Sequence, residues 1–231
     1  AYRLGFLKKP VVHIWARVLA EALRIKYPQI KITYPEYRLQ PTIDIDNAWA
    51  FLNKSFFRTM AGSVKQLFFH PAILKDRLKI LSGKMADPFD SFDYIRQKHG
   101  KDLILFILAN GNSHYDMKIS NKNKNWKKLV ADLSKSYQVG VHPSYHSDVW
   151  TEFVVKEKSV LEEITGKEIT VSRQHFLKLG FPETYRNLID AGIKEDFSMG
   201  FAGHTGFRAG VSIPYRYFDL FSNKECDLWI H

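Results

Sequence analysis

Two short segments carry side chains that could bind a metal ion. Asp44 and Asp46 end the strand-like segment 42–46, and alternate residues of a strand point to the same side, so both carboxylates could enter one site. One would bind a metal and the other would act as a base, although aspartates that cap a helix or a turn give the same pattern. His142 and His146 could converge on one ion if the segment between them turns helically. Histidine and carboxylate ligands suit zinc or a similar divalent ion.

Other polar residues could complete such a site. Arg173 could orient a carboxylate, with a buried structural ion pair as the alternative, and His175 could serve as an acid or as a further metal ligand. Asp196 and Arg208 belong to glycine-rich stretches that could line a substrate groove or form ordinary surface turns. Tyr145 lies between His142 and His146 in the sequence and is a candidate substrate contact, although its ring could equally pack against other side chains of the protein.

The composition is that of one globular domain. The chain has 231 residues, 45% of them hydrophobic and 25% charged, which allows a sizeable core. A single cysteine excludes an intramolecular disulfide framework, and no apolar run reaches the roughly 18 residues of a membrane-spanning helix. The net charge of +10 could attract nucleic acid, anionic membrane or acidic glycans without identifying any of them. The densest basic stretch, from Lys118 to Lys128, is interpreted as a solvated loop and helix face.

Strand-like and helix-like segments alternate along the chain, which predicts a parallel sheet or a barrel. In such folds the chemistry gathers at the C-terminal ends of the strands. Four polar clusters fall at predicted strand ends, namely Asp44 and Asp46, His142 and His146, Arg173 and His175, and Asp196. The predicted strands are 42–46, 102–109, 139–142, 169–172 and 193–197. The predicted helices are 11–25, 48–60, 74–81, 90–99, 126–137, 149–165 and 182–191.

The order of these segments resembles polysaccharide deacetylases of the NodB type, the fourth carbohydrate esterase family. Segment 42–46 looks like the family's first motif, with a base aspartate and a metal-binding aspartate, except that Ile45 separates the two acids. Segment 142–146 looks like its second motif, a histidine pair that completes an Asp-His-His metal site. Segments 172–175 and 196–198 look like the motifs of the base-holding arginine and of the substrate groove. Two stretches, 41–49 and 172–179, look like an envelope-polysaccharide branch of the bacterial deacetylases.

The resemblance implies an irregular (β/α) barrel and a metal-dependent hydrolase that removes N-acetyl or O-acetyl groups from a polysaccharide or its precursor. The metal, most simply zinc, would be held by Asp46, His142 and His146, and Asp44 would be the base. The family's general acid is a histidine that follows a late strand, a position that His231 matches and for which His175 competes.

Several alternatives remain open at this stage. A metal-dependent amidase for a small non-sugar amide, or a glycan-binding descendant without activity, would share the fold. A nucleic-acid module has no recognisable motif in its favour. We expect residues 1–40 to be the helical tail of an upstream region and residues 41–231 to be the catalytic domain, truncated at its C-terminus. The resemblance implies a bacterial protein of the cytoplasm or the cell envelope.

Overall fold

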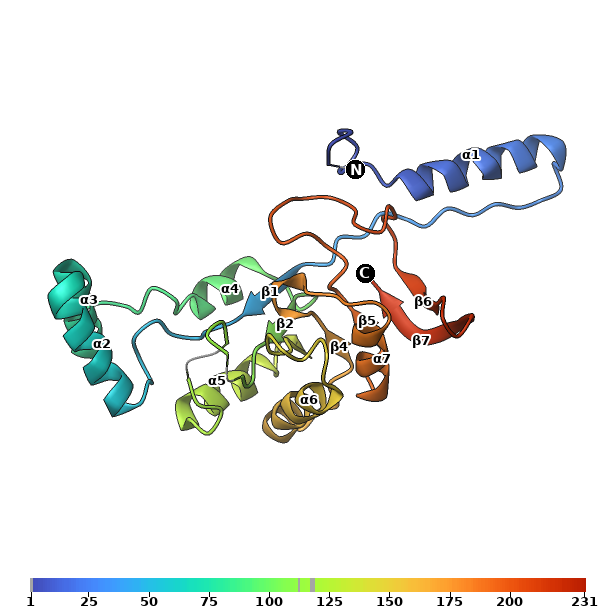
Figure 1. Cartoon of the computed structure of the whole chain (residues 1–231). Coiled ribbons are helices and arrows are strands. Elements are labelled where there is room, and N and C mark those ends of the chain that lie inside the picture. The colour runs from blue at the N-terminus through green and yellow to red at the C-terminus, as the bar shows by residue number, and fades with distance from the viewer. Residues whose placement is uncertain (1, 112, 117–118) are drawn as a thin grey trace.

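A seven-stranded sheet forms the centre of the chain in a computed structural model, which describes residues 2–111, 113–116 and 119–231; Lys118 of the basic stretch lies outside them. The strand order is β1-β2-β3-β4-β5-β7-β6, and every neighbouring pair is parallel except β6 and β7 (Figure 1). The predicted mixed α/β class with a mainly parallel sheet is therefore confirmed, and closure of the sheet into a barrel remains a prediction. The strands are β1 (Thr42–Ile45), β2 (Ile104–Ile107), β3 (Gln138–Val141), β4 (Val171–Ser172), β5 (Glu195–Asp196), β6 (Tyr215–Asp219) and β7 (Lys224–Ile230).

Three helices, α5, α6 and α7, cover one face of the sheet (Figure 1). Their apolar sides meet alternate residues of the central strands in the main core, which includes Leu105, Trp126 and Leu161. None of the helices in the described stretches is long and apolar enough to cross a membrane. The helices are α1 (Val11–Lys26), α2 (Phe56–Phe69), α3 (Pro71–Leu81), α4 (Phe92–Lys98), α5 (Lys124–Leu133), α6 (Thr151–Thr165) and α7 (Glu183–Asp190), with a 3-10 turn, η1 (His175–Leu177).

Strand β2 is buried on both faces, as its continuous apolar run predicts for a central parallel strand. Leu105 and Ile107 face the helices, whereas Ile104 and Phe106 point to the opposite face and pack with Phe197 in a second, smaller cluster. This second face lies beneath the residues that could do chemistry, so the central strand supports both the core and the candidate site.

The prediction of a helix over 48–60 is wrong for its first half. The buried carboxylate of Asp87 accepts hydrogen bonds from the backbone N–H groups of residues 50, 51 and 52, at 2.7, 2.8 and 3.0 Å, and thereby stabilises a turn there. The helix α2 begins only after Ser55, whose side chain caps it by accepting from the N–H of Arg58. Asp87 is more than thirty residues away in the sequence, so the hydrophobic periodicity of 48–60 could not reveal this turn.

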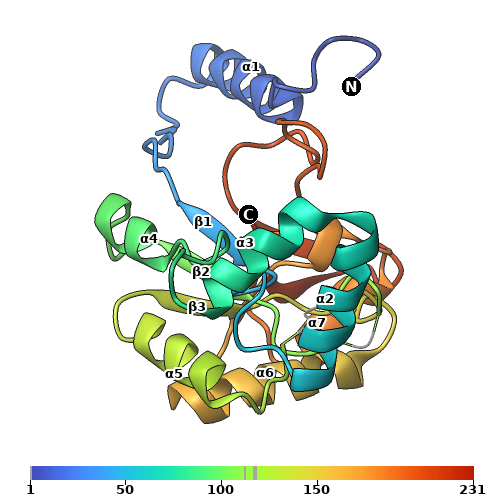
Figure 2. The same ribbon diagram turned by 90° about the vertical axis from the view of Figure 1, so that its left-hand side faces the viewer.

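Two helical parts project from the sheet region. One is α1, and the other is the hairpin formed by α2 and α3, which extends from the opposite end of the molecule (Figures 1 and 2). The segment before α1 and the first turn of α1 contact the loop between β5 and β6, since the backbone N–H of Phe207 donates to Leu7 O and that of Val12 donates to Gly210 O. The division at residue 40 stays a prediction.

Candidate metal centre

The C-terminal ends of β1, β3 and β4 bring the candidate side chains together at one edge of the sheet, with β2 between β1 and β3. Asp46 directly follows β1, His142 follows β3, and His175 comes shortly after β4. The backbone holds the last two segments in register, because His142 N donates to Ile107 O and Arg173 N donates to Val141 O. Parallel strands end at the same edge of a sheet, so residues far apart in sequence share one site.

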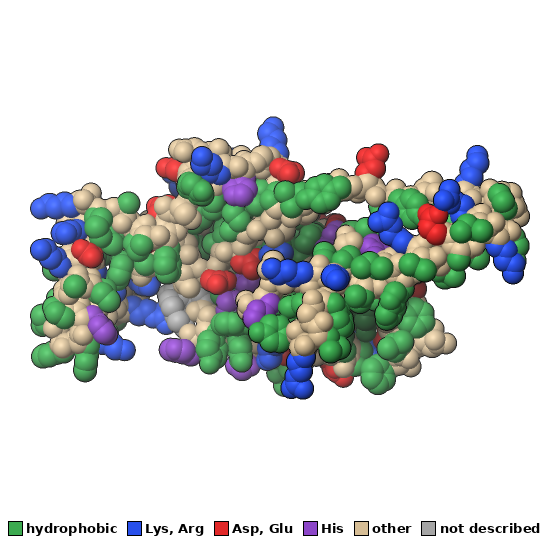
Figure 3. Space-filling model, turned by 90° about the horizontal axis from the view of Figure 1, so that it is seen from above, with side chains coloured by type: hydrophobic (Ala, Val, Ile, Leu, Met, Phe, Trp, Pro, Cys, Tyr) green, Lys and Arg blue, Asp and Glu red, His purple; other side chains and the backbone are tan. Residues whose placement is uncertain are grey.

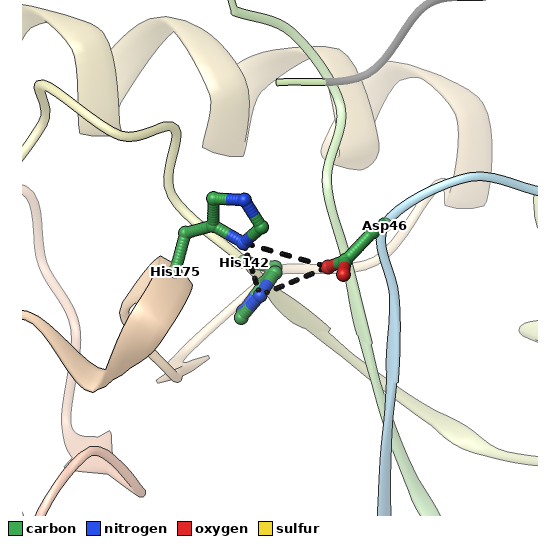
Figure 4. A group of neighbouring side chains, drawn as sticks. All are labelled: Asp46, His142 and His175. Carbon is green, nitrogen blue, oxygen red and sulfur yellow. Dashed lines mark hydrogen bonds and ion pairs between the residues drawn. The ribbon is translucent and has the colours of Figure 1, made fainter. Parts of the chain in front are cut away.

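One carboxylate and two imidazoles converge at this edge (Figure 4). Asp46 Oδ1 lies 3.2 Å from His142 Nε2 and 3.5 Å from His175 Nδ1, and these two nitrogens are 3.0 Å apart. Two ligand atoms bound tetrahedrally to zinc, with bonds of about 2.0–2.1 Å, are about 3.3–3.4 Å apart. The three separations lie close to this value, so the donor set fits a tetrahedral divalent ion that leaves one position open.

Backbone carbonyls determine which nitrogen of each ring carries a proton. His142 Nδ1 lies 2.6 Å from Arg173 O, and His175 Nε2 lies 3.2 Å from Tyr115 O. A carbonyl oxygen can only accept, so each of these nitrogens is a donor, and the nitrogens that face Asp46 carry lone pairs in the neutral rings. Two lone pairs and a carboxylate within hydrogen-bond distance repel one another unless a proton or a cation lies between them. Such carbonyl partners are typical of the histidines that bind metals.

The pKa shifts of Asp46 and His175 indicate that the cluster favours a bound positive charge. The imidazoles of His142 and His175, which donate hydrogen bonds to Asp46 when they are protonated, hold the pKa of the Asp46 carboxyl well below its usual range. Burial lowers the pKa of His175, but the Asp46 carboxylate beside it outweighs that effect, so the pKa of His175 is raised overall. The positive charge that Asp46 attracts can be a proton on His175 or a bound metal ion.

Asp44 forms a second part of the site. Its carboxylate accepts a hydrogen bond of 3.0 Å from Arg173 Nη1, with about a third of its side chain exposed. The guanidinium is held in turn by Phe197 O, to which Nε donates at 3.1 Å, and by the ring of Phe106, whose centroid lies 4.8 Å from its central carbon. Asp44 is thus a fixed, solvent-accessible carboxylate in the same hollow as Asp46.

The structure does not bring His146 into this group. Its side chain is exposed and contacts the ring of Tyr145, with centroids 5.1 Å apart. Residues 142–144 have no regular secondary structure and a turn follows only at 145–149, so the helical turn that would align His142 with His146 is not formed. His175, considered from the sequence as an acid or a further ligand, stands in the third position instead.

Asp196 and Arg208 hold the backbone of the site rather than facing its hollow. Asp196 is completely buried and accepts from Ser172 Oγ and Ser198 Oγ, both at 2.8 Å, which ties the end of β4 to β5. Burial raises its pKa to about 6 despite these donors. Arg208 donates to Leu177 O and to another backbone carbonyl of the neighbouring loop. The structure therefore corrects the interpretation of both residues as groove contacts.

Tyr145 and His231 lie beside the cluster. The ring of Tyr145 packs against Tyr115, with centroids 4.7 Å apart, and Lys178 Nζ lies 4.6 Å above it. His231 Nε2 pairs with Glu195 Oε2 at 2.8 Å, and its ring stacks on Phe197 with centroids 4.1 Å apart. His231 lines a neighbouring hollow of about 480 Å³, which shares Phe197 with the hollow around Asp46. Its role as general acid stays a prediction.

Two residues near the site, Asp116 and Glu157, have no signature in the sequence. Asp116 is buried and accepts from the backbone N–H of Tyr145 and of Ser113, which fixes the loop whose Tyr115 carbonyl holds His175. Glu157 of α6 is also buried and accepts from Ser144 N at 2.9 Å, while its Oε1 has no partner among the described residues. Burial raises its pKa to about 7. Both residues look like ordinary loop or helix acids until the tertiary structure is known.

Left-handed backbone follows His175. Phe176 and Leu177 have φ angles of 59° and 51°, a conformation that costs a residue with a side chain about 1–2 kcal/mol. Arg208 stabilises this turn through its bond to Leu177 O. Strained backbone held by its surroundings is common at functional sites, and here it positions His175 against His142.

The cluster opens into a hollow of about 500 Å³. Its lining combines the charged residues with aromatic and small side chains from the loops after β4 and β5, among them Phe176, Phe201 and His204. Phe176 and His204 are exposed, so a ligand could reach both. His204 had no partner at ligand spacing in the sequence, and the fold alone places it here.

Comparisons with known proteins give weak similarities. No protein-family model and no curated protein matches the sequence. A solved structure described as a proposed polysaccharide deacetylase from Mycobacterium smegmatis is 11% identical, with a TM-score of 0.47, covering 86% of this chain and 60% of that chain. IcaB from Ammonifex degensii is 14% identical, with a TM-score of 0.37, covering 71% of this chain and 86% of that chain. The chain thus spans 60% of the length of the first structure, and the function proposed below depends on the site itself.

Proposed function

We propose that this chain is a metal-dependent hydrolase that removes acetyl groups from a glycan. The observation that carries the proposal is the convergence of Asp46, His142 and His175, with backbone carbonyls orienting both imidazoles. The oxygen and nitrogen donors suit zinc. When bound there, the ion would polarise the acetyl carbonyl and make water a better nucleophile.

The chain's own residues supply the acid–base chemistry. Asp44, fixed by Arg173 and open to the hollow, is positioned to accept the proton of the attacking water. His175 engages both ring nitrogens, one with the cluster and one with Tyr115 O, so it has none left to protonate a leaving amine. We therefore assign proton donation to a histidine outside the cluster, either His231 or His204.

A glycan suits the hollow better than a small buried amide does. The hollow is open, and the exposed ring of Phe176 offers an apolar surface on which a sugar ring can stack. The motif resemblance around Asp44, His142 and Arg173 supports an acetylated sugar in particular. Hydrolysis of the acetamide would give a free amino sugar and acetate.

The test measures metal content and acetate release on the same samples. The purified chain is stripped with a chelator, reloaded with zinc, and incubated with an acetylated chitooligosaccharide. We expect about one zinc per chain and acetate release that needs the metal. His204→Ala and His231→Ala identify the proton donor, whose loss should lower kcat by about 100-fold or more.

Three other outcomes would contradict the proposal in different ways. A chain that binds zinc and hydrolyses only small non-sugar amides would be an amidase. A chain that binds the oligosaccharide without releasing acetate, with zinc present, would be a glycan-binding protein. A chain that binds no metal would remove the basis of the proposal.

A further inference from the structure

The helix α2 has its polar side turned inward and its apolar side turned outward. Its polar or small residues recur at helical spacing and are partly buried, namely Thr59, Gly62, Ser63 and Gln66. A helix on the surface of a globular protein normally buries its apolar stripe and exposes the polar one. The arrangement in α2 is the reverse, so its outward face calls for a partner that is itself apolar.

A buried arginine holds the hairpin together from the inside. Arg77 of α3 is 5% exposed, and its Nη1 donates to Gln66 Oε1 at 3.1 Å. A Cβ on Gly62 would overlap the guanidinium, so glycine is what lets the two helices approach. The ring of Phe51 lies under the same group, 5.2 Å from its central carbon. The polar interior shows that the outward apolar face is a consequence of how the hairpin packs.

The outward face is rich in phenylalanine. Phe57, Val64 and Phe68 recur along one side of α2, and the two phenylalanines are 84% and 75% exposed. Exposed residues on both sides widen this stripe, namely Phe56, Met60 and Leu67. A contiguous exposed apolar surface of this kind marks an interaction site.

The charge of the same hairpin is strongly positive. The stretch 54–84 contains one acidic residue, Asp76, which pairs with Lys79 at 3.5 Å. Its basic residues are Lys54, Arg58, Lys65, Lys75, Arg77, Lys79 and Lys84. Lys and Arg side chains gather beside hydrophobic side chains at the end of the molecule that α2 and α3 form (Figure 3). Arg58 and Lys65 lie along the edge of the apolar stripe.

We propose that the α2–α3 hairpin docks the protein onto an anionic lipid surface. Its apolar face would enter the boundary between headgroups and acyl chains, and the lysines beside it would meet lipid phosphates. The hairpin projects from the rest of the molecule at one end, so it can reach a flat membrane (Figure 1). The positive charge favours anionic lipid over a second copy of this chain, because two such hairpins would repel each other. The proposal does not depend on the hydrolase activity.

The test is cosedimentation of the full chain with vesicles of phosphatidylcholine alone or mixed with phosphatidylglycerol. The wild-type protein should bind the mixed vesicles and bind phosphatidylcholine weakly. The double variant Phe57→Ser/Phe68→Ser should reduce the partition coefficient at least about tenfold, since two exposed rings lose their burial in lipid. Lys65→Glu should reduce it at least about fivefold and make binding less sensitive to salt than that of the wild type, because less of the remaining attraction is electrostatic.

A matched control uses the other exposed apolar helix. Trp15 and Leu19 of α1 are 70% and 61% exposed, and Trp15→Ser/Leu19→Ser should leave vesicle binding unchanged. Because all the altered side chains are exposed, circular dichroism should show every variant folded.

Three results would overturn the proposal. One is equal binding to both kinds of vesicle, and another is loss of binding in the α1 variant but not in the α2 variant. The third is a wild-type dimer that binds no vesicles and becomes monomeric in the Phe57→Ser/Phe68→Ser variant, which would make the face a contact between copies.

Discussion

Replacing His175 with alanine should weaken zinc binding by about 100-fold or more, whereas replacing His146 should leave it unchanged. His175 Nδ1 lies 3.0 Å from His142 Nε2 and 3.5 Å from Asp46 Oδ1, which is ligand spacing. His146 is exposed and lies outside the cluster. The two variants therefore distinguish the ligand set of the structure from the one that the sequence motif predicts.

The magnitude follows from the number of donors that remain. Without His175, the cluster retains Asp46 Oδ1 and His142 Nε2, 3.2 Å apart. Loss of a residue that merely orients a ligand costs about 10-fold to 100-fold in metal affinity, so loss of a ligand should reach at least the upper value. A 100-fold loss corresponds to about 2.7 kcal/mol of binding free energy.

The assay is a competition titration of zinc between the metal-free protein and a chromophoric chelator. Circular dichroism on the same samples checks the fold, because His175 is buried and alanine leaves a cavity there. His175→Gln, which keeps most of the volume, should weaken binding as well. If His146→Ala loses the metal and both His175 variants retain it, the assignment of His175 as a ligand is refuted.

Three further predictions concern catalysis, pH and packing. Asp44→Asn should lower kcat by about 100-fold to 10,000-fold with unchanged zinc content, measured by acetate release, because the amide cannot accept the proton; near-normal turnover would place the base elsewhere. Glu157→Gln should remove a loss of wild-type stability between pH about 4.5 and about 7, on the order of 3 kcal/mol, seen by urea unfolding, because the raised pKa makes ionisation costly in the folded state; parallel pH profiles would contradict this. Gly140→Ala should cost about 1–3 kcal/mol in the same assay, since its Cβ would lie 2.7 Å from the Phe106 ring, whereas Gly203→Ala, with open space around it, should cost little; equal costs would show that the core relaxes.

The hydrophobic pattern of the sequence was enough to predict the strands and helices that alternate along the chain. The apolar run of β2 predicts a strand buried on both faces, and the alternation of strands and helices predicts a mainly parallel sheet. The spacing of Asp44 and Asp46 predicts that both point to one side, and both line the same hollow. Side-chain direction within a strand depends only on the backbone's own period, so the sequence contains it.

The tertiary structure alone decided which side chains complete the site. The motif spacing favours His146 as the third ligand, but the segment after His142 forms no helix and leaves His146 exposed outside the cluster, and a left-handed turn fixed by Arg208 brings His175 in. The carbonyls that set both tautomers belong to Arg173 and Tyr115, and a backbone carbonyl has no signature in a sequence. The outward apolar face of α2 likewise depends on a buried arginine eleven residues beyond Gln66. Contacts between distant segments determine these features, and local periodicity carries no information about them.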